Sequence, residues 1–325
     1  MQFVETSQKE LMEEMDCYGL NSRGHADSMG VTSFLETDWC DLDWSPWVPL
    51  DTPPHELAMT LSEPGVYRIK PLDKECLVYI GQTGRALRQR LRELREYRKS
   101  TELMPYNDPH TAAPSLWAWR DATGMDFACS AAPVSPDSGK DPALVKRERE
   151  GLECYLLWQY RLEFRASTLC NFGRFHPNYL KSRDKNSKKR GGRLPDGAIN
   201  PAGGASFPPL RLHGNPTDRD WMTLSWTDPR VFDDQKTANV PAKPGVYKIL
   251  DAATGELCYI GQTKTMRSRL ATHGQKSWEG REVAFAYCLQ PGTVLPHQLK
   301  ELENDLIAAF YAATKTVPRF QFLGH

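Results

Sequence analysis

The chain has 325 residues, of which 41 are basic and 41 acidic, so its formal net charge is zero, and 40% of the residues are hydrophobic. A chain of this length is expected to hold two to three globular domains. It has no signal peptide and no apolar run long enough to span a bilayer, so we expect a cytoplasmic protein without a membrane partner. Its eight cysteines form no CxxC pair and no cluster with histidine at metal-ligand spacing, which predicts reduced thiols and no structural zinc site.

Residues 1–60 form an acidic N-terminal extension. They carry 12 acidic and 2 basic side chains, a charge of −10, which leaves +10 on the other 265 residues. Because the acidic charge is concentrated in this extension and the rest of the chain is basic, a nucleic-acid partner is possible although the whole chain is neutral. The extension either covers a basic cleft and competes with a nucleic acid, or it is an acidic structural cap. Near its end, Trp44-Ser-Pro-Trp47 is interpreted as a core anchor, with base stacking as the alternative.

Residues 61–180 form the first predicted module. Two short runs of β-branched and aromatic residues flank a polar turn, which predicts a hairpin. The helix that follows has leucines at helical spacing, and a third strand and a second helix come later. The expected elements are strands at Gly65–Lys70, Leu77–Gly81 and Met125–Ser130, a helix beginning near Arg85 with Leu87, Leu91 and Leu94 buried, and a helix around Leu152–Leu157.

Residues 181–220 separate this module from the next. The stretch Lys181–Arg193 is the most basic part of the chain and continues into the Gly/Pro-rich stretch Gly191–Pro216. Such a segment is typical of a loop that follows a phosphate backbone or of a disordered linker, and the sequence leaves both open.

Residues 221–325 repeat the pattern of the first module. Pro-Gly-Val-Tyr and Tyr-Ile-Gly-Gln-Thr occur in both copies, and the two tyrosines are 12 positions apart in each, at Tyr67 and Tyr79 and at Tyr247 and Tyr259. A long-period repeat indicates two copies of one unit. The segment Trp226-Thr-Asp-Pro229 stands before the second copy as Trp44-Ser-Pro-Trp47 does before the first. The expected fold class is α/β (α+β), with two tandem modules that each have a mostly antiparallel three-stranded sheet flanked by helices.

The tyrosine pair, a helix arginine and a downstream helix glutamate resemble the GIY-YIG nuclease superfamily, which includes homing endonucleases, restriction endonucleases and excision-repair nucleases. The resemblance covers roughly residues 64–175 and 244–322. The stretch Phe172–Tyr179 also resembles the restriction-endonuclease branch.

The resemblance implies a role for each matched residue. Phosphodiester hydrolysis needs an activated water, neutralised phosphate charge and a stabilised leaving oxygen. A glutamate suits Mg²⁺ or Mn²⁺, and an arginine fork matches phosphate oxygens. By resemblance, Tyr67 and Tyr247 activate water, Tyr79 and Tyr259 position the phosphate, Arg90 and Arg269 contact it, and Glu153 and Glu303 hold the metal.

Helix register selects Arg90 over Arg88. Arg90 follows Leu87 by three residues and precedes Leu91, as Arg269 follows Met266 and precedes Leu270. Other basic residues are interpreted as DNA contacts, with a solvated basic face as the alternative. They are Arg85, Arg88, Arg92 and Arg95, with Lys99, on the other flank of this helix, and Arg174, Lys188, Lys189 and Arg190 further along the chain.

The two modules differ in two predicted site residues. His273 lies four residues after Arg269, where the first copy has Leu94, and it is a candidate proton acceptor. Asn171 lies 18 residues after Glu153, where the family often has an asparagine, and the second copy has Gln321 at that distance from Glu303. We therefore expect both modules to cut, at unequal rates.

The sequence thus predicts a Mg²⁺-dependent DNA endonuclease of restriction or phage-defence type with two active centres in one chain. Two alternatives remain. One is a DNA-binding or regulatory protein in which one or both modules are degenerate, and the other is a nuclease that repairs damaged or branched DNA. A protein partner or a homo-oligomer is left open.

Overall fold

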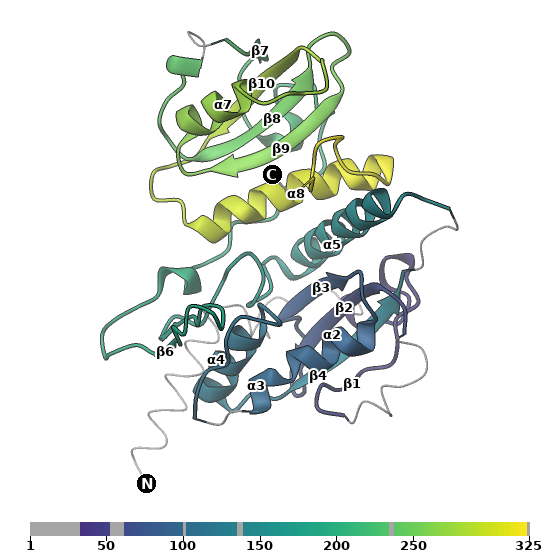
Figure 1. Ribbon diagram of the computed structural model, residues 1–325, viewed down its shortest axis with the longest axis vertical. Coiled ribbons are helices and arrows are strands. Elements are labelled where there is room, and N and C mark those ends of the chain that lie inside the picture. Colours follow the sequence, from purple (N-terminus) through teal and green to yellow (C-terminus); the bar gives the residue numbers. More distant parts are fainter. Residues whose placement is uncertain (1–32, 53–61, 100–101, 135–138, 234–236, 324–325) are drawn as a thin grey trace, which may run out of the picture. The chain divides into compact units, whose positions relative to one another are not determined.

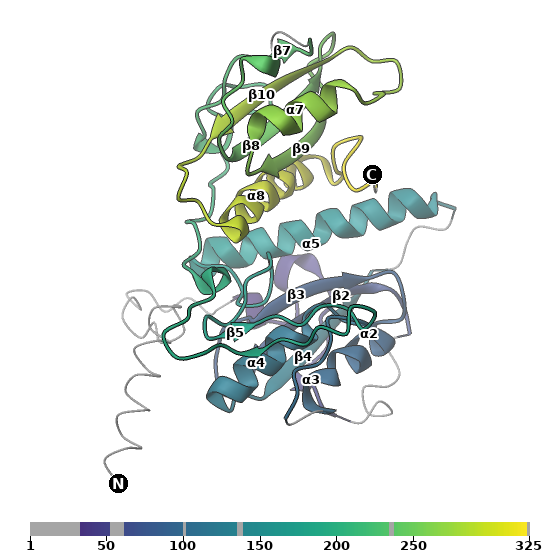
Figure 2. The same cartoon turned by 60° about the vertical axis from the view of Figure 1, so that its left-hand side comes forward.

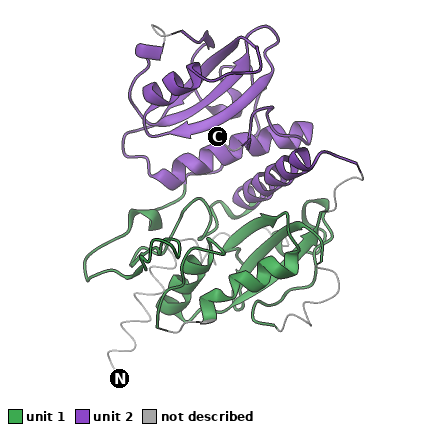
Figure 3. Ribbon diagram, in the orientation of Figure 1, with its two compact units in different colours: residues 1–138, 163–206 green, residues 139–162, 207–325 purple. Residues whose placement is uncertain are grey.

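The computed structural model describes residues 33–52, 62–99, 102–134, 139–233 and 237–323 (Figure 1). Contacts group the chain into two units, residues 1–138 with 163–206 and residues 139–162 with 207–325 (Figure 3). Most of the acidic extension, residues 1–32 and 53–60, lies outside the described residues. The two roles predicted for it, covering a basic cleft or forming a structural cap, fall on these residues. None of the described helices is long and apolar enough to cross a membrane.

The first unit is an α+β unit around one antiparallel sheet with strand order β1-β4-β2-β3. The predicted hairpin is formed by β2 and β3, in which Tyr67 pairs with Gly81. The elements are β1 (Val48–Pro49), β2 (Gly65–Pro71), β3 (Tyr79–Thr83), α2 (Leu87–Leu94), α3 (Glu96–Lys99), α4 (Ala113–Thr123), β4 (Phe127–Pro133), β5 (Tyr179–Leu180) and β6 (Gly192–Arg193).

The second unit repeats this sheet with strand order β7-β10-β8-β9. Tyr247 pairs with Gly261 in the same register as in the first unit. The elements are α5 (Pro142–Phe164, grouped with this unit up to Leu162), β7 (Arg230–Val231), β8 (Gly245–Asp251), β9 (Leu257–Thr263), α7 (Met266–Gly274), β10 (Val283–Leu289) and α8 (Pro296–Thr314).

Each sheet has four strands, which corrects the predicted three. The additional strands, β1 and β7, are two residues long and pair antiparallel with β4 and β10. A two-residue strand shows no alternation of polar and apolar residues, so periodicity does not reveal it. The third strand of the first copy also begins at Phe127, two residues later than predicted.

The tryptophans before each sheet are core anchors, as predicted. Trp44 and Trp226 are 2% and 5% exposed. In both copies the indole nitrogen donates to a tryptophan carbonyl five residues earlier, Trp39 or Trp221, at 2.9 Å. The repeat therefore begins upstream of the hairpins.

The sheet of the second unit is buried on both faces. Val246 packs with Leu302 and Leu306 of α8, whereas Tyr247 packs with the α7 side chains Met266 and Leu270 on the other face. Successive strand residues point to opposite faces, so the alternation that buries Val246 also directs Tyr247 towards α7. The first unit places Tyr67 with Leu87 and Leu91 of α2 in the same way.

The basic stretch after the first module is an ordered hairpin that belongs to the first unit. The strand β5 pairs with β6, and residues 181–206 group with that unit. Asn107 N–H donates to the Arg183 carbonyl at 3.1 Å, and Lys185 N–H donates to Asp108 Oδ1 at 2.8 Å. Of the two interpretations, the disordered linker is therefore wrong for this stretch.

The helices α5 and α8 have equivalent places in the repeat, and they pack on each other within the second unit (Figures 1 and 2). Arg161 of α5 contacts Glu301 of α8. Gly151, the counterpart of Glu301, faces Tyr311, the counterpart of Arg161, and a Cβ on Gly151 would lie 2.6 Å from that ring. Reciprocal contacts of this kind are typical of two-fold interfaces. The helix pair is therefore pseudo-symmetric.

Candidate functional site

The second unit brings five predicted site residues together. Tyr247 on β8 and Tyr259 on β9 stack with ring centroids 6.1 Å apart. Arg269 Nε donates to the Tyr247 hydroxyl at 3.0 Å, and His273 Nε2 lies 2.8 Å from the same oxygen. One helical turn separates Arg269 from His273, so both project from the same face of α7. His273 is only 1% exposed.

Glu303 on α8 is the fifth residue of this group. Burial raises the pKa of its carboxyl to about 7, against the opposing effects of the Gln262 backbone N–H, Lys300 and Arg269. Glu303 in turn raises the pKa of Tyr259, after burial as the larger cause. A carboxyl that titrates near neutrality beside two cations is typical of a functional site.

An open pocket of about 370 Å³ adjoins these residues, and it is lined by Gln262, Thr263, Lys264, Arg269, Pro296 and Lys300. Three of the six side chains are cationic. Lysine and arginine side chains at a concave surface attract and orient phosphate groups. The pocket therefore offers a place for a phosphate next to the tyrosine pair.

A divalent metal would have one protein carboxylate here. Among the described residues there is no group of three or more histidine, cysteine, aspartate or glutamate side chains that could hold a metal. Mg²⁺ usually keeps several waters and binds through one or two carboxylates together with substrate phosphates. The donor set around Glu303 fits such a weakly held Mg²⁺, and it does not fit a metal that needs a protein cage.

The first unit contains the same tyrosine pair, with ring centroids of Tyr67 and Tyr79 6.0 Å apart. The Tyr67 hydroxyl lies 2.8 Å from His110 Nε2. Arg90 Nη1 donates to the Pro109 carbonyl at 3.0 Å and to Glu93 at 3.2 Å. Burial lowers the pKa of Arg90, but the charge and hydrogen bond of Tyr67 outweigh it and raise the pKa.

His110 is a site residue that the sequence did not reveal. Leu94, at the place of His273, is a fully buried core residue. A histidine from the segment between α3 and α4 makes the tyrosine contact in its place, at the distance found in the second unit. Asn107–His110 is visible in the sequence as an insertion of the first copy, but no spacing connects it with Tyr67, 43 residues earlier.

A glycine lies opposite Tyr67 in the first unit and opposite Tyr247 in the second. A Cβ on Gly81 would lie 2.5 Å from the Tyr67 hydroxyl and 2.7 Å from Tyr79 Cε1. Gly261 faces the Tyr247 hydroxyl and the Tyr259 ring in the same way. The space between the two tyrosines therefore exists because this position has no side chain.

Asn171 and Gln321 hold the strands that carry the second tyrosines. Asn171 Oδ1 accepts from Ile80 N–H at 3.0 Å, and its Nδ2 donates to the Ile80 carbonyl at 2.8 Å. Gln321 Oε1 accepts from Ile260 N–H at 3.0 Å. Ile80 and Ile260 directly follow Tyr79 and Tyr259. The structure thus gives Asn171 a positioning role, and the difference from Gln321 that the sequence emphasised is small.

Glu153 lies on α5, and the structure describes it with the second unit. It is half-buried, one residue before Cys154, whose carbonyl accepts from Asn304 Nδ2 on α8 at 3.1 Å. Within the first unit, the residues around the site are the two tyrosines, Arg90 and His110, and the role of Glu153 in the first repeat stays a prediction.

The predicted DNA contacts fall into three groups. Arg174 is 4% exposed and donates to the Ser167 and Gly204 carbonyls, so it has a structural role in place of the predicted DNA contact. Three others have protein partners: Arg85 pairs with Glu93, Arg95 donates to main-chain carbonyls, and Arg190 donates to the Met104 carbonyl. The other four, Arg88, Arg92, Lys188 and Lys189, are exposed, as are Arg85 and Arg190.

The chain was compared with protein-family models, with curated proteins and with solved structures, and none of them matches.

Proposed function

We propose that the chain is a Mg²⁺-dependent DNA endonuclease with one active centre in each repeat, of restriction or phage-defence type. The observation that carries this proposal is the tyrosine–histidine pair, which recurs at 2.8 Å in both units from unrelated sequence positions. Core packing alone does not explain why a buried histidine contacts the equivalent tyrosine hydroxyl in each unit. The resemblance of the repeat to GIY-YIG nucleases supports the same conclusion.

In the second module, the cations of the pocket bind the phosphate. Glu303 would hold a Mg²⁺ ion, which would supply positive charge for the phosphate and acidify water. Tyr247 first releases its own hydroxyl proton to solvent, and its oxygen then accepts the proton of water. Burial raises the pKa of its hydroxyl, and the hydrogen bond from Arg269 lowers it. Two neighbours on α7, Arg269 and His273, fix the position of that oxygen.

A plasmid-nicking assay tests the proposal. Supercoiled DNA with Mg²⁺ is expected to give nicked circles first and linear DNA later, and EDTA is expected to stop both steps. Binding without cleavage under all metal conditions would instead support a DNA-binding protein with degenerate modules. A panel of plain, methylated, single-stranded and branched DNAs separates a restriction enzyme from a repair nuclease.

Substitution of Arg90 separates phosphate activation from DNA binding. Arg90→Ala is expected to slow linearisation by at least about a hundredfold with nearly unchanged affinity, because its guanidinium stabilises charge at the scissile phosphate. The exposed Arg88 serves as the matched control on the same helix. Arg88→Ala is expected to keep the cleavage rate and to lower the salt slope of binding by about one unit. The opposite pattern would mean that the helix register is wrong.

Substitution of the facing glycines tests the tyrosine geometry. Gly261→Ala is expected to displace the Tyr247 hydroxyl and to lower the cleavage rate of the second module about a hundredfold, since small misplacements have effects of this size. Gly292→Ala is the control, because a Cβ there meets nothing within 4 Å. The measurement is the single-turnover nicking rate of each variant. Equal rates for Gly261→Ala and Gly292→Ala would exclude Tyr247 from the reaction.

A further inference from the structure

The hydrogen bonds of His110 define which ring nitrogen carries the proton. The Ala112 backbone N–H donates to His110 Nδ1 at 3.0 Å. A nitrogen that accepts such a bond has no proton of its own in the neutral ring, so the proton is on Nε2. Nε2 is the atom that lies 2.8 Å from the Tyr67 hydroxyl. The imidazole is therefore the donor in this pair, and the tyrosine oxygen is the acceptor.

The surroundings of His110 keep the ring neutral. Its side chain is fully buried, and burial is the largest cause that holds its pKa well below the usual value. Arg90 and Arg85, at the α2 side, and Lys181, next to β5, lower the pKa further. The groups that face the ring from β2 and β3 are the phenols Tyr67 and Tyr79. The described contacts to the ring include no carboxylate that would favour the charged form.

The basic hairpin fixes the segment that carries His110. Arg190 Nη1 donates to the Met104 carbonyl at 2.6 Å, and the Arg190 guanidinium lies 4.2 Å from the Tyr106 ring centroid. Asp108 accepts from the Lys185 N–H at 2.8 Å. The ring is thus held before any substrate arrives, as a preorganised donor must be.

We propose that His110 is the positioning residue of the first module, a permanent Nε2–H donor to the Tyr67 oxygen. The proposal rests on the proposed nuclease function in one respect, the role of Tyr67 as the proton acceptor for water. With the Nε2–H donor of His110 and the positive charge of Arg90 nearby, the oxygen is prepared to hold negative charge. Tyr67 releases its own proton to solvent and then accepts the proton of water, and His110 keeps its Nε2 proton throughout.

Two substitutions distinguish a donor from a simple packing residue. The amide nitrogen of His110→Gln reaches the place of Nε2 and still donates. In His110→Asn the side chain is shorter, and its amide can take the place of Nδ1 but cannot reach that of Nε2. This variant therefore keeps the hydrogen bond from the Ala112 N–H and loses the one to the Tyr67 hydroxyl. In a Glu303→Gln background, where only the first module cuts, the Gln variant is expected to stay within about tenfold of the parent rate. The Asn variant is expected to fall at least about a hundredfold, the usual effect of one preorganised donor.

A direct measurement does not depend on cleavage. The ¹⁵N chemical shifts of His110 in the full chain are expected to show a protonated Nε2 and an unprotonated Nδ1, unchanged between about pH 6 and pH 9. A proton on Nδ1, or titration near the usual histidine pKa, overturns the proposal, as do equal rates of the Gln and Asn variants. The expected shifts in a protein that cuts no DNA would leave the donor role in place and refute the proposed function alone.

Discussion

Glu303→Gln is expected to remove cleavage by the second module and to leave a protein that nicks plasmid DNA without making it linear. The amide keeps the shape of the side chain and removes the negative charge that a hard divalent cation needs. Glu153→Gln is expected to do the same to the first module. The double variant is expected to bind DNA and to cut neither strand. Linear product from the double variant at the wild-type rate would reject both assignments.

The pKa of Glu303 makes this prediction sharper. Burial raises it to about 7, so the carboxyl is half protonated near neutral pH, and a metal must displace that proton to bind. Cleavage by the second module should therefore require more Mg²⁺ at pH 6 than at pH 8, by about tenfold per pH unit below 7. Glu282→Gln, an exposed carboxylate of the same unit, is the control and should change nothing.

Local patterns in the sequence predict the repeat and most of its elements well. The runs around Tyr67 and Tyr79 form a hairpin because β-branched and aromatic residues on both sides of a turn favour it. Leu87, Leu91 and Leu94 are buried on α2, as helical spacing predicts. These features depend on residues close in sequence, and the second copy supplies an independent test of each.

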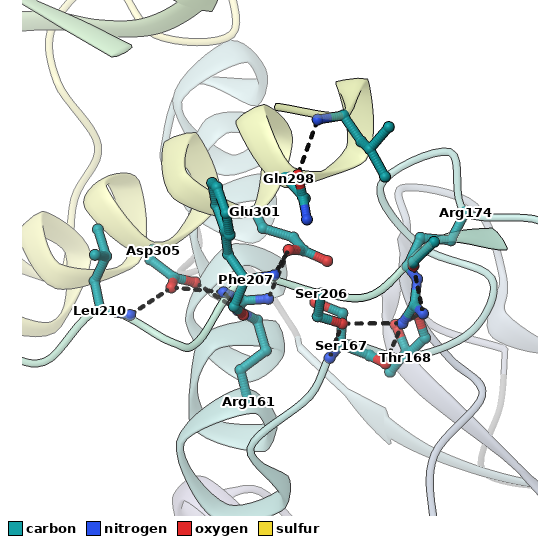
Figure 4. A network of polar contacts seen from close by, with 12 residues as sticks. Arg161, Ser167, Thr168, Arg174, Ser206, Phe207, Leu210, Gln298, Glu301 and Asp305 are labelled. Atoms are coloured by element: carbon teal, nitrogen blue, oxygen red, sulfur yellow. Dashed lines mark hydrogen bonds and ion pairs between the residues drawn. The ribbon is translucent and has the colours of Figure 1, made fainter. Parts of the chain in front are cut away.

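Features that depend on long-range contacts are not visible in the sequence. The segment that brings His110 to Tyr67 is held in part by the basic hairpin, which comes some 70 residues later in the chain. The sequence places Arg174 near a basic loop, which predicts a DNA contact. In the structure its guanidinium donates to main-chain carbonyls of its own unit (Figure 4). Charge and spacing describe what a side chain is able to do, whereas burial decides which partner it has.

The contact between α5 and α8 depends on a buried ionic network (Figure 4). Arg161 Nε lies 3.0 Å from Asp305 Oδ1, its Nη1 lies 3.4 Å from Glu301 Oε2, and all three side chains are fully buried. The carboxylates also accept backbone N–H groups, Glu301 from Phe207 at 2.7 Å and Asp305 from Leu210 at 2.9 Å. The network therefore joins two helices and the start of the segment that leads into the second sheet.

Arg161→Met is expected to lower the free energy of unfolding of the second unit by about 3–5 kcal/mol, because it leaves two buried carboxylates without their cation. Apolar replacement of the carboxylates offers no simple rescue, since it would leave the Phe207 and Leu210 N–H groups buried without acceptors. Arg211→Met, at an exposed arginine of the same unit, is the control and should change the free energy by less than about 0.5 kcal/mol. Urea unfolding followed by tryptophan fluorescence measures both.

Asp305→Asn separates the charge of the network from its shape, and its effect should depend on pH. The usual pKa of an aspartate is 3.8, and burial raises that of Asp305 to about 6 although Arg161 opposes the shift. The folded protein therefore binds a proton that the unfolded chain releases, so the stabilising contribution is complete below about pH 3.8 and is lost as the pH rises through 6. An asparagine does not titrate. The stability of Asp305→Asn relative to wild type should consequently improve between about pH 4.5 and pH 7.5. Parallel curves for the two proteins would mean that Arg161 keeps Asp305 ionised throughout, and the attraction within the pair would then exceed the cost of burying it.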